Sequence, residues 1–395
     1  MHRAYVHVGL PKTGTSYLQK ALWASKDRLA EAGVLVPGDR QQFQRRAVWD
    51  LLGRRLRGVD QPEVPGSWQA LLDRVRSGPG EQVVLSEELL VHAARGVARR
   101  VVHDLRPAEV HVVVTVRDLG RVLGSMWQQE LAKGSTCPWP DFLAAVRDPE
   151  QGPPSAGVGF WLRYDLRRVL ATWASVVPAE RIHVVVVPGA GSPPTALLER
   201  FAVAAGLDYA ALTPPDKGVN TAIGRVEAEL LRRLNVSLGG RLNERQYRHT
   251  VNLLKPVLRS RASVTPITLP EAERSWAEEA SRDLVEFLKN GSYDVVGDLD
   301  DLLPGTAPGA GGDPHEVTDG ELADAAIAAL TATAEYHATY WWKMRRREQP
   351  SEAPARTRLA SATRALVFEA KVRALEAADR NRFLARAAKL YLRRR

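Results

Sequence analysis

The chain has 395 residues, of which 55 are Lys or Arg and 46 are Asp or Glu, so its formal net charge is +9. A 45% share of apolar residues excludes general disorder, and the single cysteine, Cys137, excludes a disulfide framework or a cysteine-rich zinc module. No run approaches the roughly 20 apolar residues of a membrane-spanning helix, and no leader pattern precedes the first apolar segment, so we expect a cytoplasmic protein.

The first 33 residues predict a strand, a turn and a helix in succession. Residues 4–8 are β-branched, aromatic and apolar enough for a short strand, and residues 9–14 form a Gly- and Pro-containing turn. A helix is predicted over residues 15–31, where apolar side chains recur on one face, and Gly33 is its expected stop.

The middle of the chain alternates strands with helices. Further strands are predicted at residues 81–85, 110–116 and 182–187, and helices at residues 87–102, 118–133, 160–176 and 195–205. Asp118 is placed to cap the second of these helices. This alternation predicts an α/β fold in which a P-loop-like parallel sheet is flanked by helices.

After about residue 220 the pattern becomes helical, with helices predicted at residues 222–235, 243–258, 271–288, 319–347 and 355–395. A Pro- and Gly-rich stretch between Pro304 and Pro314 is the clearest boundary. We therefore predict a main domain at residues 1–303, a linker at 304–316 and a helical basic C-terminal extension at 317–395.

The positive charge is concentrated at the C-terminal end. Residues 343–395 contain 16 Lys or Arg against 5 Asp or Glu, a local charge of +11, which leaves −2 for the rest of the chain. Nucleic acid is therefore not the expected partner of the main domain. Apolar residues among these arginines predict one or two amphipathic helices with a basic face. Such helices pack on the body or on a partner chain, or contact an anionic membrane surface, an acidic glycan or nucleic acid; the pattern does not choose among these.

The most informative residues follow the first predicted strand and open the first helix. In this position, free backbone N–H groups and the helix dipole converge on an anion. Gly14 permits close approach, Thr15 and Ser16 add hydroxyl groups, and Lys12 adds a positive charge. The nucleotide-triphosphate loop G-x-x-x-x-G-K-[ST] requires lysine where Thr15 stands, which disfavours the alternative of a kinase or NTPase.

A second pair of polar residues follows the strand predicted at residues 110–116. Arg117 ends this strand, and Ser125 lies about two helical turns further on. Ligands of parallel α/β sheets bind beyond the carboxyl ends of the strands, where Arg can hold a phosphate with its planar fork. The other interpretation is a surface ion pair between Arg117 and a nearby acid.

Together, the two motifs resemble the sulfotransferase superfamily, in particular its bacterial, carbohydrate-type members, over roughly residues 4–260. These enzymes use 3′-phosphoadenosine 5′-phosphosulfate (PAPS) as co-substrate, with a hydroxyl acceptor and no metal. The resemblance implies that the loop binds the 5′-phosphosulfate, that two residues bind the 3′-phosphate, and that two residues of a late basic loop close over the nucleotide. The residues concerned are, in that order, Pro11, Lys12, Thr13, Gly14, Thr15 and Ser16; Arg117 and Ser125; Lys217 and Gly218.

The same resemblance implies a catalytic glutamate just after the second main strand. Glu88 is the expected base for the acceptor proton, with Glu87 second, and Lys12 is suited to the leaving-group oxygen. The competing interpretation makes both glutamates first-turn residues that complement a helix dipole. His92 and His103 are weaker candidates for a base. An inert Glu88 would instead fit a non-catalytic nucleotide-binding protein.

Overall fold

The computed structural model describes residues 2–54, 61–215, 223–259, 265–304 and 311–348, together with Leu366 and Ala370. At its centre lies a sheet of six strands in the order β2-β3-β1-β4-β5-β6, and every neighbouring pair is parallel. The strands are β1 (Arg3–His7), β2 (Val34–Leu35), β3 (Gln82–Ser86), β4 (Glu109–Val116), β5 (Ile182–Val186) and β6 (Asp294–Val296). The predicted α/β class is therefore confirmed.

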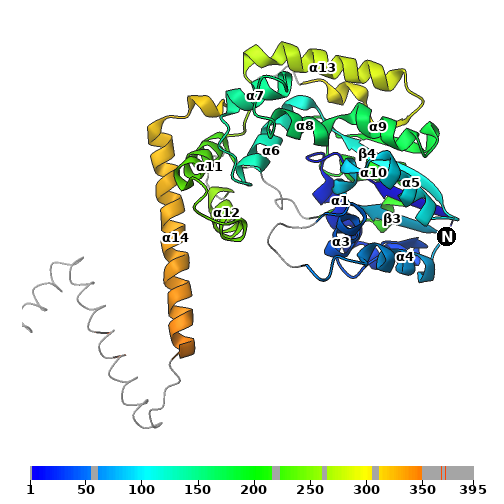
Figure 1. Cartoon of the computed structure of the whole chain (residues 1–395), viewed down its shortest axis with the longest axis horizontal. Coiled ribbons are helices and arrows are strands. Elements are labelled where there is room, and N and C mark those ends of the chain that lie inside the picture. The colour runs from blue at the N-terminus through cyan, green and yellow to red at the C-terminus, as the bar shows by residue number, and fades with distance from the viewer. Residues whose placement is uncertain are drawn as a thin grey trace, which may run out of the picture. The chain divides into compact units, whose positions relative to one another are not determined.

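Helices surround this sheet (Figure 1). The α-helices are α1 (Thr15–Ala24), α2 (Lys26–Glu31), α3 (Gln41–Leu51), α4 (Ser67–Ser77), α5 (Arg95–Asp104), α6 (Leu119–Leu131), α7 (Trp139–Arg147), α8 (Gly157–Tyr164), α9 (Leu166–Ala174), α10 (Ala196–Ala204), α11 (Arg225–Leu238), α12 (Glu244–Arg259), α13 (Glu271–Lys289) and α14 (Asp319–Glu348). Short 3₁₀ helices are η1 (Glu88–His92), η2 (Ala179–Arg181), η3 (Tyr209–Ala211), η4 (Leu299–Leu302) and η5 (Pro314–Glu316).

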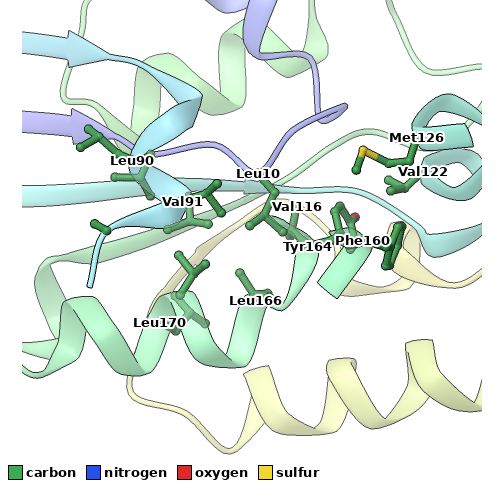
Figure 2. Packing of buried hydrophobic residues seen from close by; sticks show 14 of the residues in the cluster. Leu10, Leu90, Val91, Val116, Val122, Met126, Phe160, Tyr164, Leu166 and Leu170 are labelled. Atoms are coloured by element: carbon green, nitrogen blue, oxygen red, sulfur yellow. The ribbon is translucent and has the colours of Figure 1, made fainter. Parts of the chain in front are cut away.

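Both faces of the sheet are covered by helices. Alternate residues of each strand point to opposite faces and so belong to two different apolar clusters. On one face, the odd-numbered residues Tyr5 and Val113 pack with side chains of α1, α2 and α10. On the other face, Val6 and Val112 belong to a larger cluster that includes side chains of α3 to α9 and α13. Leu10, from the turn after β1, is fully buried in this larger cluster, where Figure 2 shows it among Val116, Tyr164 and Leu166. The loop is thus anchored in the core by an apolar side chain.

Several predicted helices are divided in the structure. The helix predicted at residues 15–31 breaks at Ser25, whose hydroxyl donates to Ala21 O and accepts from Thr213 N. The helix predicted at residues 160–176 breaks at Asp165, whose carboxylate accepts from Arg168 N and caps α9. The segment predicted as one helix at residues 87–102 begins as η1 and continues as α5. In each case a local hydrogen bond or an extended residue interrupts an otherwise helical pattern.

Contacts divide the chain into unit 1, Met1–Ala332, and unit 2, Thr333–Arg395, and α14 begins in the first and ends in the second. In unit 1, Val317, Leu322 and Ala325 are buried with Val226 of α11. The predicted boundaries at residues 303 and 316 are not tested by this grouping and stay predictions. Of the helical basic extension predicted at residues 317–395, the part after residue 348 lies outside the described residues, apart from Leu366 and Ala370.

Candidate functional site

The loop between β1 and α1 holds the backbone in conformations that few side chains allow. Gly9, Lys12 and Gly14 have φ angles of +97°, +66° and +87°. At Gly14, the backbone angle favours glycine, and an added Cβ would lie 2.3 Å from Leu197 Cδ2, so that side chain would have to shift. Gly14 is also the N-cap of α1, with no side-chain cap and no acidic residue in the first turn. The first N–H groups of α1 are therefore available to an anion.

A buried chain of hydrogen bonds braces this loop from below. His7 Nδ1 lies 2.8 Å from Ser86 Oγ, and His7 Nε2 lies 3.2 Å from Thr115 Oγ1. Thr115 Oγ1 lies 2.5 Å from Thr13 Oγ1, which donates to Leu10 O. Because Thr13 gives its only proton to Leu10 O, Thr115 must donate to Thr13 and accept from His7.

The direction of this chain assigns the tautomer of His7. Its Nε2 carries the proton, and its Nδ1 accepts from the Ser86 hydroxyl. Complete burial lowers the pKa of His7 to about 3, so the ring is neutral at neutral pH. A neutral ring is what this series of hydrogen bonds requires, because Nδ1 must accept while Nε2 donates. This chain of hydrogen bonds joins β3, β1 and β4 to the loop. Sequence reasoning missed it because its residues are far apart in the sequence.

The two adjacent glutamates point to different places. Glu88 lines a cavity that Lys12, Gly14 and Thr15 of the loop also border, and it accepts a hydrogen bond of 2.7 Å from Thr15 Oγ1. Glu87 is 1% exposed; its carboxylate accepts from Leu89 N and lies 3.5 Å from Arg45 Nε. Burial raises the pKa of Glu87 despite the opposing charge of Arg45. Glu88 therefore has access to a ligand in the cavity, whereas Glu87 is tied to η1 and α3.

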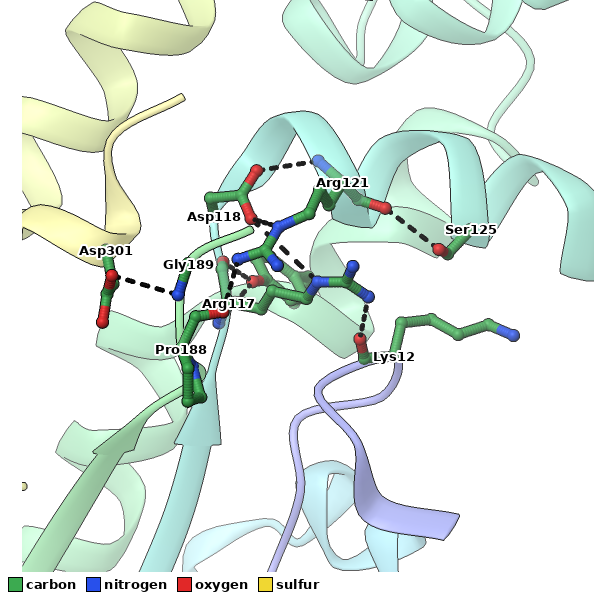
Figure 3. Close-up of polar contacts among 9 residues, drawn as sticks. Lys12, Arg117, Asp118, Arg121, Ser125, Pro188, Gly189 and Asp301 are labelled. Atoms are coloured by element: carbon green, nitrogen blue, oxygen red, sulfur yellow. Dashed lines mark hydrogen bonds and ion pairs between the residues drawn. The ribbon is translucent and has the colours of Figure 1, made fainter. Parts of the chain in front are cut away.

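Arg117, directly after β4, and Ser125, on α6, both line the cavity. Figure 3 shows their polar contacts. Arg117 Nη1 donates to Lys12 O at 3.3 Å, while its buried Nε has no hydrogen-bond partner and lies 4.0 Å from Asp118 Oδ2. Burial, followed by the nearby Arg121, lowers the pKa of Arg117. Asp118 caps α6 as predicted, by accepting from Arg121 N at 2.9 Å. Ser125 Oγ donates to Arg121 O, so it must turn away from that carbonyl before it can donate to an anion.

These side chains enclose a cavity of about 440 Å³ at the carboxyl end of the sheet. That volume is within the range of small-molecule sites. The cavity lies where the order of the strands along the sheet reverses. On one side of β1 lie β3 and β2, and on its other side lie β4, β5 and β6. Ligands of open parallel sheets bind at such switch points. Its described lining consists of Lys12, Gly14, Thr15, Ser16, Tyr17, Glu88, Arg117, Ser125, Gln128, Gln129, Ala132, Ile223, Lys255 and Arg259.

The cavity is cationic, with four Lys or Arg side chains and one carboxylate in its described lining. Burial lowers the pKa of Lys12 to about 8; Glu88 opposes this shift, and the charges of Lys255, Lys133 and Arg259 add to it. Sequence reasoning missed Lys255 and Arg259: the helix predicted at residues 243–258 stops one residue short of Arg259, whereas in α12 the two residues, four apart, share one face. Only the fold reveals that this face borders the loop.

The structure brings together most, but not all, of the predicted site residues. Pro11 and Thr13 are buried, and neither contributes to the described cavity lining. Thr13 can reach an anion only through its backbone N–H, and Pro11 has no N–H to donate. Lys217 and Gly218 lie outside the described residues. His92 is half-buried, and its pKa is lowered to about 4 by burial and neighbouring cations. His103 is exposed beside Asp104.

No metal cluster or membrane-spanning helix is found in the described parts of the chain. No group of three or more His, Cys, Asp or Glu side chains is arranged there to hold a metal ion. None of the helices in these ranges is both long and apolar enough to cross a membrane.

Comparison with known proteins gives one distant likeness. No protein-family model and no curated protein matches the chain. Among solved structures, it is similar to a sulfotransferase from Alicyclobacillus acidocaldarius, with 14% identity and a TM-score of 0.35 over 61% of this chain and 95% of that one. So distant a likeness carries no argument about family or function, which must come from the site. The fold and the site define an α/β protein with the charge and free amides to hold an anion beside a carboxylate.

Proposed function

We propose that the protein is a sulfotransferase that moves a sulfuryl group from PAPS to a hydroxyl of a carbohydrate or glycosylated metabolite. The observation that carries this proposal is the convergence of Lys12, Glu88 and Arg117 on one cavity at the N-terminus of α1. A nucleotide with two separate anionic groups needs cations and amides at two places, and transfer to a hydroxyl needs a base between nucleotide and acceptor. The resemblance of the two motifs to the sulfotransferase superfamily supports the same assignment of these residues.

In this mechanism the loop amides of α1 and Lys12 hold the 5′-phosphosulfate, while Arg117 and Ser125 hold the 3′-phosphate. The acceptor oxygen attacks sulfur as the bond from sulfur to the bridging phosphate oxygen breaks. Glu88 takes the acceptor proton, and Lys12 stabilises the charge on the departing adenosine 3′,5′-bisphosphate. Positioning and electrostatic stabilisation supply most of the rate, by analogy with phosphoryl transfer.

The hydrogen bond from Thr15 to Glu88 supports the assignment of the base. The hydroxyl of Thr15 donates to Oε2 and so holds the carboxylate in place. The other carboxylate oxygen, Oε1, can then take the proton of the acceptor hydroxyl. Glu88 and Lys12 also interact electrostatically, which couples the base to the group proposed to meet the leaving charge.

Calorimetry with adenosine 3′,5′-bisphosphate in the absence of metal tests the proposal. We expect wild type to bind, and Arg117→Ala to weaken binding by about 1.5–3 kcal/mol, the usual cost of losing a charged hydrogen bond. The control is Arg74→Ala. Arg74 is on α4, forms an exposed ion pair with Asp39 and does not line the cavity. Unchanged affinity in Arg117→Ala would refute the phosphate contact, and binding that requires magnesium would favour the kinase or NTPase alternative.

A further inference from the structure

Lys255 and Arg259, here called the α12 cation pair, line the cavity without an acidic partner. Lys255 is half-buried and Arg259 is exposed, and neither makes a hydrogen bond or an ion pair with any residue that the structure describes. Elsewhere on the same helix, Arg248 pairs with Glu244 at 2.6 Å. The α12 cation pair has no such acid, because Val251 stands four residues before Lys255. Two like charges four residues apart also repel each other.

The electrostatic effect of the α12 cation pair reaches across the cavity. Burial and the charge of Arg259 lower the pKa of Lys255, and both side chains contribute to the lowered pKa of Lys12. Glu88 is the one carboxylate among the described lining residues. A cleft lined mainly by one sign of charge concentrates ligands of the opposite sign. The cavity as a whole therefore favours ligands with several negative charges.

The proposed nucleotide contacts account for only part of this positive charge. They come from the loop, from β4 and from α6, all next to the sheet. The α12 cation pair belongs to the helical part α11–α12, which is joined to the end of α6 through the hydrogen bond from Tyr247 Oη to Leu131 O at 2.8 Å. At 1.5 Å per residue, Lys255 and Arg259 lie about 12 and 18 Å beyond Tyr247 along the helix axis. In Figure 1, α11 and α12 lie beyond α6, apart from the sheet strands.

We propose that the α12 cation pair binds an anionic group of the acceptor, so that the acceptor is a hydroxyl compound carrying a carboxylate, sulfate or phosphate. This inference rests on the proposed function, because it assigns the nucleotide to the other cations of the cavity. An acidic sugar meets both requirements: its hydroxyl faces the carboxylate of Glu88, and its anionic group meets the two cations. Lysine and arginine bind all three anionic groups through charge-assisted hydrogen bonds.

The test compares matched neutral and anionic sugars on protein saturated with adenosine 3′,5′-bisphosphate. The pairs are glucose and glucuronate, glucose and glucose 6-phosphate, and N-acetylglucosamine and N-acetylglucosamine 6-sulfate, with binding followed by ligand-observed NMR. For wild type we expect at least one anionic sugar to bind about tenfold more tightly than its neutral partner. The double variant Lys255→Ala/Arg259→Ala should lose this preference while its nucleotide affinity falls much less than that of Arg117→Ala, because only the long-range attraction of the two charges is removed. Arg248→Ala, on the same helix, should behave as wild type.

Two results would overturn the inference. A double variant that loses nucleotide affinity as strongly as Arg117→Ala would show that the α12 cation pair holds the donor. Wild type that prefers no anionic sugar in any of the three pairs would show that the acceptor's charge is not recognised. Failure of wild type to bind the nucleotide contradicts the proposed function instead, and the sugar comparison is then read without nucleotide.

Discussion

The two neighbouring glutamates that follow β3, Glu87 and Glu88, lie in different chemical environments. Glu87 is buried, paired with Arg45 and bonded to the backbone of η1, which is the role of a capping and packing residue. Glu88 reaches the cavity and accepts from Thr15. The sequence predicts that only one of the two reaches the site, because adjacent side chains point in different directions. The structure separates them through the extended backbone of Glu87 before η1 begins.

This difference predicts opposite effects of two matched substitutions. Glu88→Gln keeps an oxygen that accepts from Thr15 but removes the base, so kcat should fall about 100- to 10,000-fold with little change in nucleotide binding. Glu87→Gln should retain most activity, because Glu87 is bonded to Leu89 N beside Arg45 and does not line the cavity. Release of adenosine 3′,5′-bisphosphate from PAPS with a panel of sugar acceptors, together with calorimetry, measures both effects. Loss of turnover in Glu87→Gln but not in Glu88→Gln would reverse the assignment.

Elements with strong local patterns were predicted well. The continuous apolar residues of β4 and the capping carboxylate of Asp118 are visible in the sequence, and the structure confirms both. The strands β2 and β6 were missed, because each is two or three residues long and is defined by its pairing with a neighbour rather than by its own residues. The helices α3, α4 and α7 were also missed, although the amphipathic pattern of α4 is present in its sequence.

The candidate site was predictable to the extent that its residues follow one another at strand ends. Lys12, Glu88 and Arg117 each stand just after a predicted strand, and parallel strands bring such positions to one edge. Lys255 was not predictable in this way, since its helix is placed against the cavity by tertiary packing. The same is true of His7, whose partners Ser86 and Thr115 lie 79 and 108 residues away.

The hydrogen-bond chain through β3, β1 and β4 makes the stability of these elements depend on pH. The pKa of His7 is about 3 in the folded protein, against about 6.5 when unfolded. Between these values the unfolded chain binds a proton that the folded chain does not, so the free energy of unfolding rises with pH. The stabilisation from neutral His7 is fully present above its unfolded pKa and is lost as the pH falls towards 3.

Urea denaturation of wild type and His7→Gln at pH 7 and pH 5 measures this contribution. The loss of stability between pH 7 and pH 5 should be about 2 kcal/mol smaller in His7→Gln, because the variant lacks the proton uptake on unfolding. His103→Gln is the matched control, since His103 is an exposed histidine outside the chain of hydrogen bonds. Equal pH dependence in wild type and His7→Gln would mean that His7 is not held neutral by the fold.

At the scale of the whole molecule, residues on the two sides of the Pro- and Gly-rich stretch pack against each other. The Pro- and Gly-rich stretch around residue 304 predicts that the main domain ends at 303. In the structure, Val317 and Leu322 are buried against α11, and Arg225 Nη2 lies 2.5 Å from Glu321 Oε1. Gly312 also bridges to Ile267. Residues after the stretch therefore stabilise the unit that precedes it.

Two truncated chains distinguish these boundaries. A chain ending at Ala332 keeps the contacts of Val317 and Leu322 and should unfold in urea at nearly the wild-type concentration. A chain ending at Leu303 loses both side chains and leaves Val226 exposed, so its free energy of unfolding should fall by about 3–6 kcal/mol, at roughly 1.5–3 kcal/mol for each large apolar side chain. Nucleotide calorimetry on the longer chain checks that its cavity is intact. Equal stability of the two chains would place the boundary at 303 and make the packing on α11 energetically neutral.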